Sequence, residues 1–177
     1  MRHVLLLRGI NLGARRRIPM AELRALLGEE YEDVATYVQS GNVVLSAAER
    51  SAPRLAAAVS ARISEHFGFE VPVIARSRAE LQAVIARDPI AGAAADPKHY
   101  QVTFLERAPA EDALRRLHEI AVASERIAVD GREIYSWHPD GIARSKLAAK
   151  LSAAQLGVGA TSRNWTTVTT LARMAAG

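Results

Sequence analysis

The residue types best suited to chemistry in the N-terminal part of the chain lie in one short loop. Arg8, Asn11 and Arg15 belong to it, Arg16 and Arg17 follow, and a glycine stands on either side of Asn11. Guanidinium and backbone N–H groups in a loop that leads into a helix can converge on an anion without any special fold. The loop lacks the Gly-Lys-Ser/Thr ending that a nucleotide-hydrolysing P-loop requires. It therefore predicts an anion-binding loop, with a solvated basic loop as the alternative.

A second polar group surrounds a predicted hairpin turn at Ser40-Gly41. A two-residue turn there would set Gln39 opposite Asn42 and Tyr37 opposite Val44, all on one face. Two amides and a tyrosine on one face can read the edge of a base or a sugar through directional hydrogen bonds. Alternatively, the amides simply close the hairpin. The neighbouring strands lack the stacking aromatic residues of an RNA-recognition sheet, which disfavours that mode of single-strand binding.

The C-terminal part of the chain carries two more groups of this kind. Arg144, Ser145 and Lys146 are predicted at a helix start, where the positive helix end and the cations together favour an anion. The alternative is a charged, solvated helix surface. Arg163 and Asn164 are predicted to project from the first turn of the last helix.

Catalytic constellations are scarce. The chain has no cysteine, which excludes disulfides, thiolate catalysis and cysteine-ligated zinc. The five histidines show no metal-ligand spacing, and neither Ser40 nor Ser145 lies in a Gly-x-Ser-x-Gly or Ser-x-x-Lys motif. The acidic residues are scattered, and no two are placed for general acid–base catalysis. We therefore predict no metal and no cofactor, and we assign no catalytic residue.

The composition is that of a globular protein with a modest basic balance. The 177 residues are 49% hydrophobic and carry a formal net charge of +4, which fits one domain or two small subdomains and suits acidic partners. Arginine and alanine are both heavily used, so a coding bias is an alternative explanation of the charge. No apolar run reaches the roughly 18 residues of a membrane span, and the N-terminus does not resemble a signal peptide. We expect a soluble cytoplasmic protein with no membrane partner.

Hydrophobic periodicity predicts the elements that position these residues. Residues 4–7 form a continuous apolar run, which indicates a central strand buried on both faces there. The β-α-β-β-α-β order that follows is typical of the ferredoxin-like arrangement. The expected elements are a strand at 4–8, a helix opened by Pro19, strands at 34–38 and 42–46, a helix at 53–67, a strand at 71–75 and a helix at 78–87.

After a break at residues 88–98 the order nearly repeats. We expect a strand at 100–105, a helix at 109–121, a hairpin of 126–129 with 133–137 around Asp130-Gly131, a helix at 143–155, and a helix at 164–175 in place of a last strand. Thr161 or Ser162 would cap the last helix, and Trp165 would lie in its buried stripe. The prediction is an α+β fold with two ferredoxin-like halves packed together, residues 1–87 and 99–177, the second with an extra C-terminal helix.

Four stretches resemble the bacterial "domain of unknown function 1697" family. They are LLRGINLG with IPMAEL (residues 6–13 and 18–23), YVQSGNVVL (37–45), GIARSKL (141–147) and TSRNWTTVTTL (161–171). The resemblance implies a two-part α+β fold of ferredoxin-like halves, and it implies no established activity. Ala143 stands where the family pattern has a glycine, which matters only if a ligand approaches the backbone there.

These groups lead to one functional hypothesis and two alternatives. The leading hypothesis is a module that binds an anionic ligand (a nucleotide, a phosphorylated metabolite or nucleic acid) in a polar, basic cleft. One alternative is an uncharacterised enzyme that acts on such a ligand through electrostatic stabilisation. The other is a structural or partner-binding protein, and the sequence does not specify an oligomeric state. The predicted ligand-binding residues are Arg8, Asn11, Arg15, Gln39, Ser40, Asn42, Arg144, Ser145, Lys146, Arg163 and Asn164.

Overall fold

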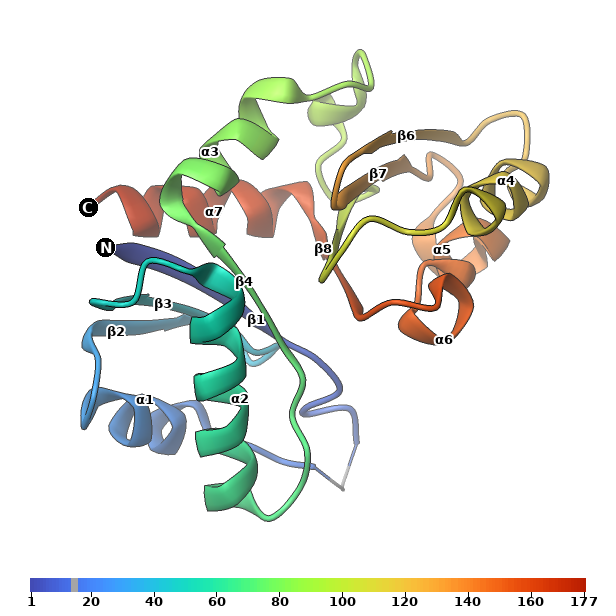
Figure 1. Ribbon diagram of the computed structural model, residues 1–177. Helices are drawn as coiled ribbons and strands as arrows, with labels where there is room; N and C mark the ends of the chain where they lie inside the picture. Colours follow the sequence, from blue (N-terminus) through green and yellow to red (C-terminus); the bar gives the residue numbers. More distant parts are fainter. Residues whose placement is uncertain (14–15) are drawn as a thin grey trace. The chain divides into compact units, whose positions relative to one another are not determined.

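The computed structural model describes residues 1–13 and 16–177, and it has an α+β architecture with two four-stranded antiparallel sheets (Figure 1). Contacts divide the chain into two compact units. The first unit is Met1–Ala83 with Thr170–Gly177, and the second unit is Val84–Thr169. Each unit contains one of the sheets. Within the described part of the chain, no helix combines the length and the apolar character needed to cross a membrane.

The first unit has its elements in the predicted order. They are β1 (Arg2–Leu7), α1 (Met20–Gly28), β2 (Glu32–Tyr37), β3 (Asn42–Ser46), α2 (Ala52–Phe67) and β4 (Val73–Ser77), after which α3 (Arg78–Arg87) begins. The strands lie in the order β2-β3-β1-β4, and every neighbouring pair is antiparallel. Side chains from α1 and α2 share one apolar cluster with Leu5 and Leu7 of β1, so both helices cover the same face of the sheet.

β1 is the buried centre of this sheet, between β3 and β4. All four residues at positions 4–7 are at most 1% exposed, although successive side chains of a strand point to opposite faces. The expectation that this strand is central and shielded on both faces is therefore confirmed. At its N-terminal end, the Arg2 guanidinium donates to the Met174 carbonyl over 3.0 Å, which places the end of the chain against β1.

The helix boundaries follow from local capping. Pro19 precedes α1 with an extended backbone (φ −64°, ψ 128°), so α1 begins one residue later than predicted. In α2, the Ser51 hydroxyl accepts a hydrogen bond from the Arg54 N–H, and the helix ends at Gly68, whose φ of 75° is left-handed.

The turn between β2 and β3 is longer than predicted. Tyr37 pairs with Asn42, so four residues separate the strands. The predicted two-residue turn, with Gln39 opposite Asn42 and Tyr37 opposite Val44, is therefore wrong. The physical reason is Val38, which has a φ of 51° and is 53% exposed, so it leaves the strand instead of packing in the core.

The second unit repeats the antiparallel arrangement, with strands in the order β6-β7-β5-β8. Its elements are η1 (Ala93–Ala95), β5 (Tyr100–Leu105), α4 (Glu111–Ile120), β6 (Arg126–Asp130), β7 (Glu133–Trp137), η2 (Ile142–Arg144), α5 (Lys146–Lys150), α6 (Ala153–Leu156), β8 (Ala160–Asn164) and the start of α7 (Trp165–Ala176). The hairpin of β6 and β7 is the predicted one, but Asp130 pairs with Glu133, so the turn residues are Gly131 and Arg132.

The predicted helix at 143–155 is divided into three short elements. Ser145 ends η2 and starts α5 as its N-cap. Leu151 and Ser152 separate α5 from α6, which ends at Gly157 with a left-handed φ of 66°. The hydrogen-bonding preference of serine for helix starts interrupts what the apolar spacing alone presents as one helix.

A last strand, β8, stands where none was predicted. Thr161 and Ser162 belong to this strand and do not cap the last helix. The Ser162 hydroxyl lies 2.7 Å from the Thr103 hydroxyl, its cross-strand partner on β5. β-Branched residues such as Thr161 fit a pleated strand, which explains why tertiary pairing wins over the cap.

Trp165 lies in the core of the second unit, as predicted. It is 7% exposed, and its ring stacks on Tyr100 with centroids 4.7 Å apart and planes inclined by 25°. Tyr135 is next to Tyr100, and its hydroxyl donates to the Val84 carbonyl over 3.0 Å. These rings fill the face of the sheet opposite to the one that packs against α4, α5 and α6.

Candidate functional site

The predicted ligand-binding residues divide between the two units. Those of the first unit are Arg8, Asn11, Gln39, Ser40 and Asn42, and those of the second unit are Arg144, Ser145, Lys146, Arg163 and Asn164. Arg15 lies outside the described residues. The local contacts of each residue separate side chains that build the fold from side chains that are open to a ligand.

Asn11 holds the loop after β1 in place. Its Oδ1 accepts from the Ile18 N–H over 2.9 Å, and its Nδ2 donates to the Ile18 carbonyl over 3.1 Å and to the Gln39 carbonyl over 2.9 Å. Its own φ of 55° is left-handed, which asparagine tolerates better than most residues. Since the whole amide is engaged, Asn11 closes the loop and ties it to the turn between β2 and β3.

Asn42 stabilises the turn between β2 and β3. It is fully buried, and its Nδ2 donates to the Tyr37 carbonyl over 3.1 Å and to the Ser40 hydroxyl over 2.9 Å. Asn42 and Ser40 therefore contribute to the turn itself. Gln39 is exposed, and its side chain makes no hydrogen bond with the described residues, so it is the member of this group that a ligand could reach.

The cations of the loop after β1 are accessible. Arg8 is half-buried, and Arg16 and Arg17 are exposed. The Arg16 guanidinium lies 5.8 Å from the centroid of the Phe69 ring, and the Arg17 Nε donates to the Gly13 carbonyl over 3.4 Å. Among residues 1–13 and 16–177, none of these three arginines has an acidic partner, which leaves their charge available to an anion.

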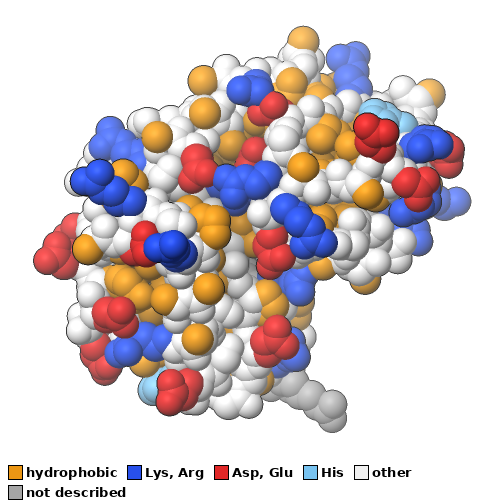
Figure 2. All heavy atoms as spheres, in the orientation of Figure 1, with side chains coloured by type: hydrophobic (Ala, Val, Ile, Leu, Met, Phe, Trp, Pro, Cys, Tyr) orange, Lys and Arg blue, Asp and Glu red, His pale blue; other side chains and the backbone are white. Residues whose placement is uncertain are grey.

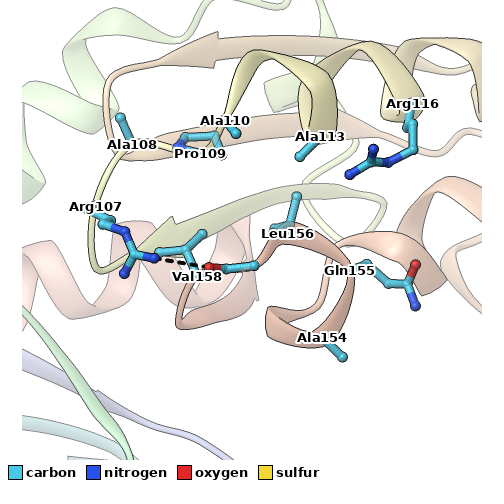
Figure 3. A pocket seen from close by; sticks show the side chains of 11 residues that line it. Arg107, Ala108, Pro109, Ala110, Ala113, Arg116, Ala154, Gln155, Leu156 and Val158 are labelled. Atoms are coloured by element: carbon cyan, nitrogen blue, oxygen red, sulfur yellow. Dashed lines mark hydrogen bonds between the residues drawn. The ribbon is translucent and has the colours of Figure 1, made fainter.

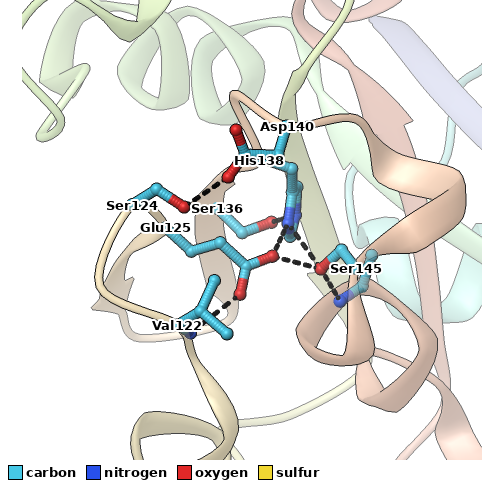
Figure 4. A network of polar contacts seen from close by, with 8 residues as sticks. Val122, Ser124, Glu125, Ser136, His138, Asp140 and Ser145 are labelled. Atoms are coloured by element: carbon cyan, nitrogen blue, oxygen red, sulfur yellow. Dashed lines mark hydrogen bonds and ion pairs between the residues drawn. The ribbon is translucent and has the colours of Figure 1, made fainter.

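In the second unit, Ser145 belongs to a buried polar network (Figure 4). Its hydroxyl donates to a Glu125 carboxylate oxygen, lies 2.9 Å from His138 Nδ1, and accepts from the Ala148 N–H over 2.9 Å. The same Glu125 oxygen lies 2.9 Å from His138 Nδ1, and His138 Nε2 lies 2.9 Å from the Ser136 hydroxyl. The network fixes the segment after β7 to the segment before β6.

A serine, a histidine and a glutamate in contact suggest nucleophilic catalysis, but their geometry argues against it. Ser145 is partly exposed, whereas His138 is 1% exposed and the Glu125 side chain is 5% exposed. Ser145 and Glu125 both contact Nδ1 of His138. In a catalytic triad the serine contacts one ring nitrogen of the histidine and the carboxylate contacts the other. In the part of the chain that the structure describes, no three metal-ligating side chains are grouped for an ion either. The network therefore has a structural role, which is to hold the segment after β7 against the segment before β6.

The charge of Glu125 makes this hydrogen-bond network sensitive to acid. Burial raises the pKa of its carboxyl, but hydrogen bonds from Ser145, His138 and the Val122 N–H outweigh burial, so the pKa is lowered. A lowered pKa stabilises the fold at pH values above the ordinary glutamate value, and this stability is lost as the pH falls through the folded-state pKa.

We therefore expect Glu125→Gln to reduce the free energy of unfolding at neutral pH by roughly 1.5–3 kcal/mol, the range for hydrogen bonds to a charged group. The difference between parent and variant should shrink as the pH is lowered below about 4.3, the ordinary glutamate value. Urea unfolding of parent and variant at a series of pH values measures this difference in the free energy of unfolding. Glu119→Gln is the control, because Glu119 is exposed on α4. A difference for Glu125→Gln that does not vary with pH would contradict the role of the charge.

Arg144 and Lys146 flank Ser145 and are both exposed. Neither forms an ion pair within the described part of the chain, and Lys150, one turn further on, donates only to the Gln155 side chain over 3.4 Å. Ser145 thus anchors the segment while its two neighbours present their charges to solvent.

Arg163 and Asn164 lie at the end of β8, so the prediction that they project from the first turn of the last helix is wrong. Both side chains are engaged within the second unit. Arg163 Nη1 donates to the Thr161 hydroxyl over 2.7 Å and to the Ser162 carbonyl over 2.8 Å, and burial lowers the pKa of its guanidinium to about 10. Asn164 Oδ1 accepts from the Thr167 N–H over 2.9 Å, so Asn164 caps α7. Their contacts indicate that both residues organise the passage from β8 to α7.

A hollow of about 540 Å³ lies between the start of α4 and the end of α6, and it contains none of the predicted residues (Figure 3). Arg107 and Arg116 are its charged lining residues. Arg107 donates to the Gly157 carbonyl over 3.1 Å, and Arg116 pairs with Asp112. The remaining lining is largely small and apolar, and among the described residues only Arg116 of the two has its charge balanced by an acidic partner. Its small, widely spaced lining residues offered no motif in the sequence.

The distribution of charge along the chain singles out two segments. Residues 1–21 and 141–177 together contain ten of the 23 basic residues and none of the 19 acidic residues. The thirteen other basic residues share residues 22–140 with all the acidic ones, and on the face of the molecule in Figure 2 basic and acidic side chains are interspersed. Of the cations described above without acidic partners, Arg107 lies outside these two segments, whereas Arg8, Arg16, Arg17, Arg144, Lys146 and Lys150 lie within them.

Fold and sites together define a class of α+β protein with two four-stranded antiparallel sheets and two acid-free basic segments. The chain belongs to the family described as "Protein of unknown function (DUF1697)", whose model matches residues 1–135. This confirms the resemblance found in the sequence.

Solved structures support a shared fold. The conserved bacterial protein SP0830 from Streptococcus pneumoniae superposes with a TM-score of 0.78 at 21% sequence identity, over 98% of each chain. No match was found among curated proteins. At this identity the likeness concerns the fold alone.

Proposed function

We propose that this protein binds an anionic ligand that carries phosphate, namely a nucleotide, a phosphorylated metabolite or nucleic acid. The observation that carries the proposal is the set of accessible cations without acidic partners in the two acid-free segments. Because these two segments contain no acidic residue, their cations leave a local positive potential that favours anions. In the first unit Arg8 and Gln39 are the residues proposed to contact such a ligand, and in the second unit, taken by itself, they are Arg144 and Lys146.

Binding is favoured over catalysis by the state of the titratable groups. An enzyme needs a group of shifted pKa beside its substrate. Glu125 has a lowered pKa, but it is enclosed in the network that anchors Ser145. An enzyme acting on the same ligand is the alternative, and a partner-binding protein takes the lead if no anion binds. A cytoplasmic location is part of the proposal.

We also infer that each half of the chain, residues 1–87 and 99–177, is ferredoxin-like. The strand orders β2-β3-β1-β4 and β6-β7-β5-β8 support this inference, because each outer pair of strands flanks the first strand and third strand of its half. The helices that follow β1 and β5 connect each first strand to its second one, as the β-α-β-β-α-β arrangement requires.

The test is a thermal-stabilisation screen of the full chain with inorganic phosphate, nucleotides, sugar phosphates and short oligonucleotides. A ligand that binds only the folded state raises the melting temperature. We expect at least one phosphate compound to do so, and the double variant Arg144→Ala/Lys146→Ala to lose most of that shift while its own melting temperature stays near that of the parent. Arg54→Ala/Lys98→Ala is the matched control, because it removes two exposed cations that lie outside the acid-free segments.

If the ligand is single-stranded nucleic acid, the salt dependence of binding is the sharper readout. Each neutralised phosphate contributes about 0.7 to the slope of log K against log salt, so the Arg144→Ala/Lys146→Ala variant should flatten the slope by about 1 to 1.5. Binding should weaken similarly for all sequences. If no anion binds, or if this variant binds as tightly as the parent, the proposal is wrong and the basic residues reflect composition.

A further inference from the structure

We propose that two copies of this chain pair through the open edge of β6, antiparallel, with a two-fold axis at Ala128. β6 is the outer strand of the second sheet, next to β7. Apart from its ladder with β7, the backbone of Arg126–Asp130 makes no hydrogen bond with the described residues. A strand edge of this kind is a template for another strand.

The hairpin decides which backbone groups of β6 point outward. Asp130 pairs with Glu133 across the two-residue turn, so Asp130, Ala128 and Arg126 exchange hydrogen bonds with β7. Ile127 and Val129 alternate with them, and their N–H and C=O groups point away from β7. With Ala128 opposite Ala128 of the second copy, Ile127 comes opposite Val129, and both residues of each such pair present outward groups. The register thus satisfies the backbone of both edges.

The side chains of β6 complement themselves in the same register. Arg126 comes opposite Asp130 of the second copy and Asp130 opposite its Arg126, so two cross-strand ion pairs form by symmetry. Both side chains are already held near the sheet: the Arg126 guanidinium lies 5.5 Å from the centroid of the Trp137 ring, and Asp130 pairs with Arg87. A carboxylate can accept from a second guanidinium, because its oxygens offer about four acceptor positions.

There is room beside this edge for the second strand. A hollow of about 610 Å³ is lined by the start of β6, by residues 89–91 and by residues 121–123 at the end of α4. Most of its lining is apolar, and Val122 is 53% exposed there. Because the charges are symmetric about one residue of this same strand, a second copy fits this edge better than an unrelated peptide does.

The decisive experiment uses charge reversal in two separate full-length variants, with mass measured by sedimentation equilibrium. The parent should dimerise with increasing concentration. Arg126→Glu alone, and Asp130→Lys alone, should each weaken the dimer by roughly 10- to 100-fold, because two ion pairs become two repulsions. Mixing the two variants should restore a dimer that contains one copy of each, since every pair is then of opposite charge. Circular dichroism establishes that each variant is folded.

Two controls isolate the cause. Arg126→Gln and Asp130→Asn remove the charges without reversing them. Either variant alone keeps no cross-strand ion pair, whereas their mixed dimer keeps one, so the mixture should bind more tightly than either variant alone and less tightly than the parent. Arg54→Glu changes the net charge in the first unit and should leave the dimer unaffected. A parent that stays monomeric up to its solubility limit overturns the proposal. A dimer that survives either reversal, or a mixture of the reversed variants that stays monomeric, overturns it as well.

Discussion

Replacement of Trp165 by alanine is expected to lower the free energy of unfolding by roughly 3–5 kcal/mol, the cost of truncating a large buried aromatic residue. The side chain is 7% exposed, and its ring stacks on Tyr100, which is fully buried. Stacked aromatic pairs add to the burial of apolar area. The variant therefore loses the burial, the stacking and the close packing around Tyr100 together, and urea unfolding of parent and variant measures the sum.

Trp165→Phe is the matched control for this prediction. It keeps an aromatic ring against Tyr100 and removes only part of the volume, so it should cost clearly less than the alanine variant. A loss below about 1 kcal/mol for Trp165→Ala would place it among ordinary surface substitutions. That outcome, combined with lost ligand binding, would instead make Trp165 a stacking platform for a ligand.

Elements with a strong hydrophobic pattern could be predicted from the sequence. The run at 4–7 does not alternate, and it forms a strand shielded on both faces. In α2, Leu55, Val59 and Ile63 lie on one stripe at helical spacing, and all three are buried. These features depend on local periodicity, which the sequence displays directly.

Elements that depend on pairing with distant residues could not be predicted. β8 has polar side chains at Thr161, Ser162 and Arg163, and only its ladder with β5 makes it a strand. The predicted register of β2 and β3 was wrong because nothing in the sequence indicates that Val38 takes a φ of 51°. In both cases tertiary contacts override the local preference.

For the candidate site, the sequence shows which residues are polar or charged, but it does not show which of them the fold itself uses. Asn11 bonds to the Gln39 carbonyl, 28 positions away, and Ser145 bonds to Glu125, 20 positions away. Because those partners are distant in sequence, the sequence could not show that these two polar side chains hold loops in place through hydrogen bonds. Arg144 and Lys146 are different, because a cation exposed to solvent can be predicted from the sequence without knowing any distant partner.

Gly41→Ala is expected to cost roughly 2–5 kcal/mol, the second-largest effect among these predictions, from two separate causes. The φ of Gly41 is 74°, and a residue with a Cβ is disfavoured there by about 1–2 kcal/mol. An added Cβ would also lie 2.7 Å from the Leu7 Cβ and 2.9 Å from the Ile10 Cδ1, an overlap that adds about 1–3 kcal/mol. Neither neighbour can yield easily, because Leu7 is in the central strand and its N–H donates to the Gly41 carbonyl over 2.8 Å.

Gly68→Ala separates the two causes. Gly68 has nearly the same φ, 75°, but nothing lies within 4 Å of its added Cβ. It should therefore show the conformational cost alone, about 1–2 kcal/mol. The difference between the two variants, measured by urea unfolding in the same buffer, is the cost of forcing β3 away from β1. If both variants lose the same stability, the close approach of Gly41 to Leu7 contributes nothing, and the turn between β2 and β3 is held by its hydrogen bonds and its left-handed backbone alone.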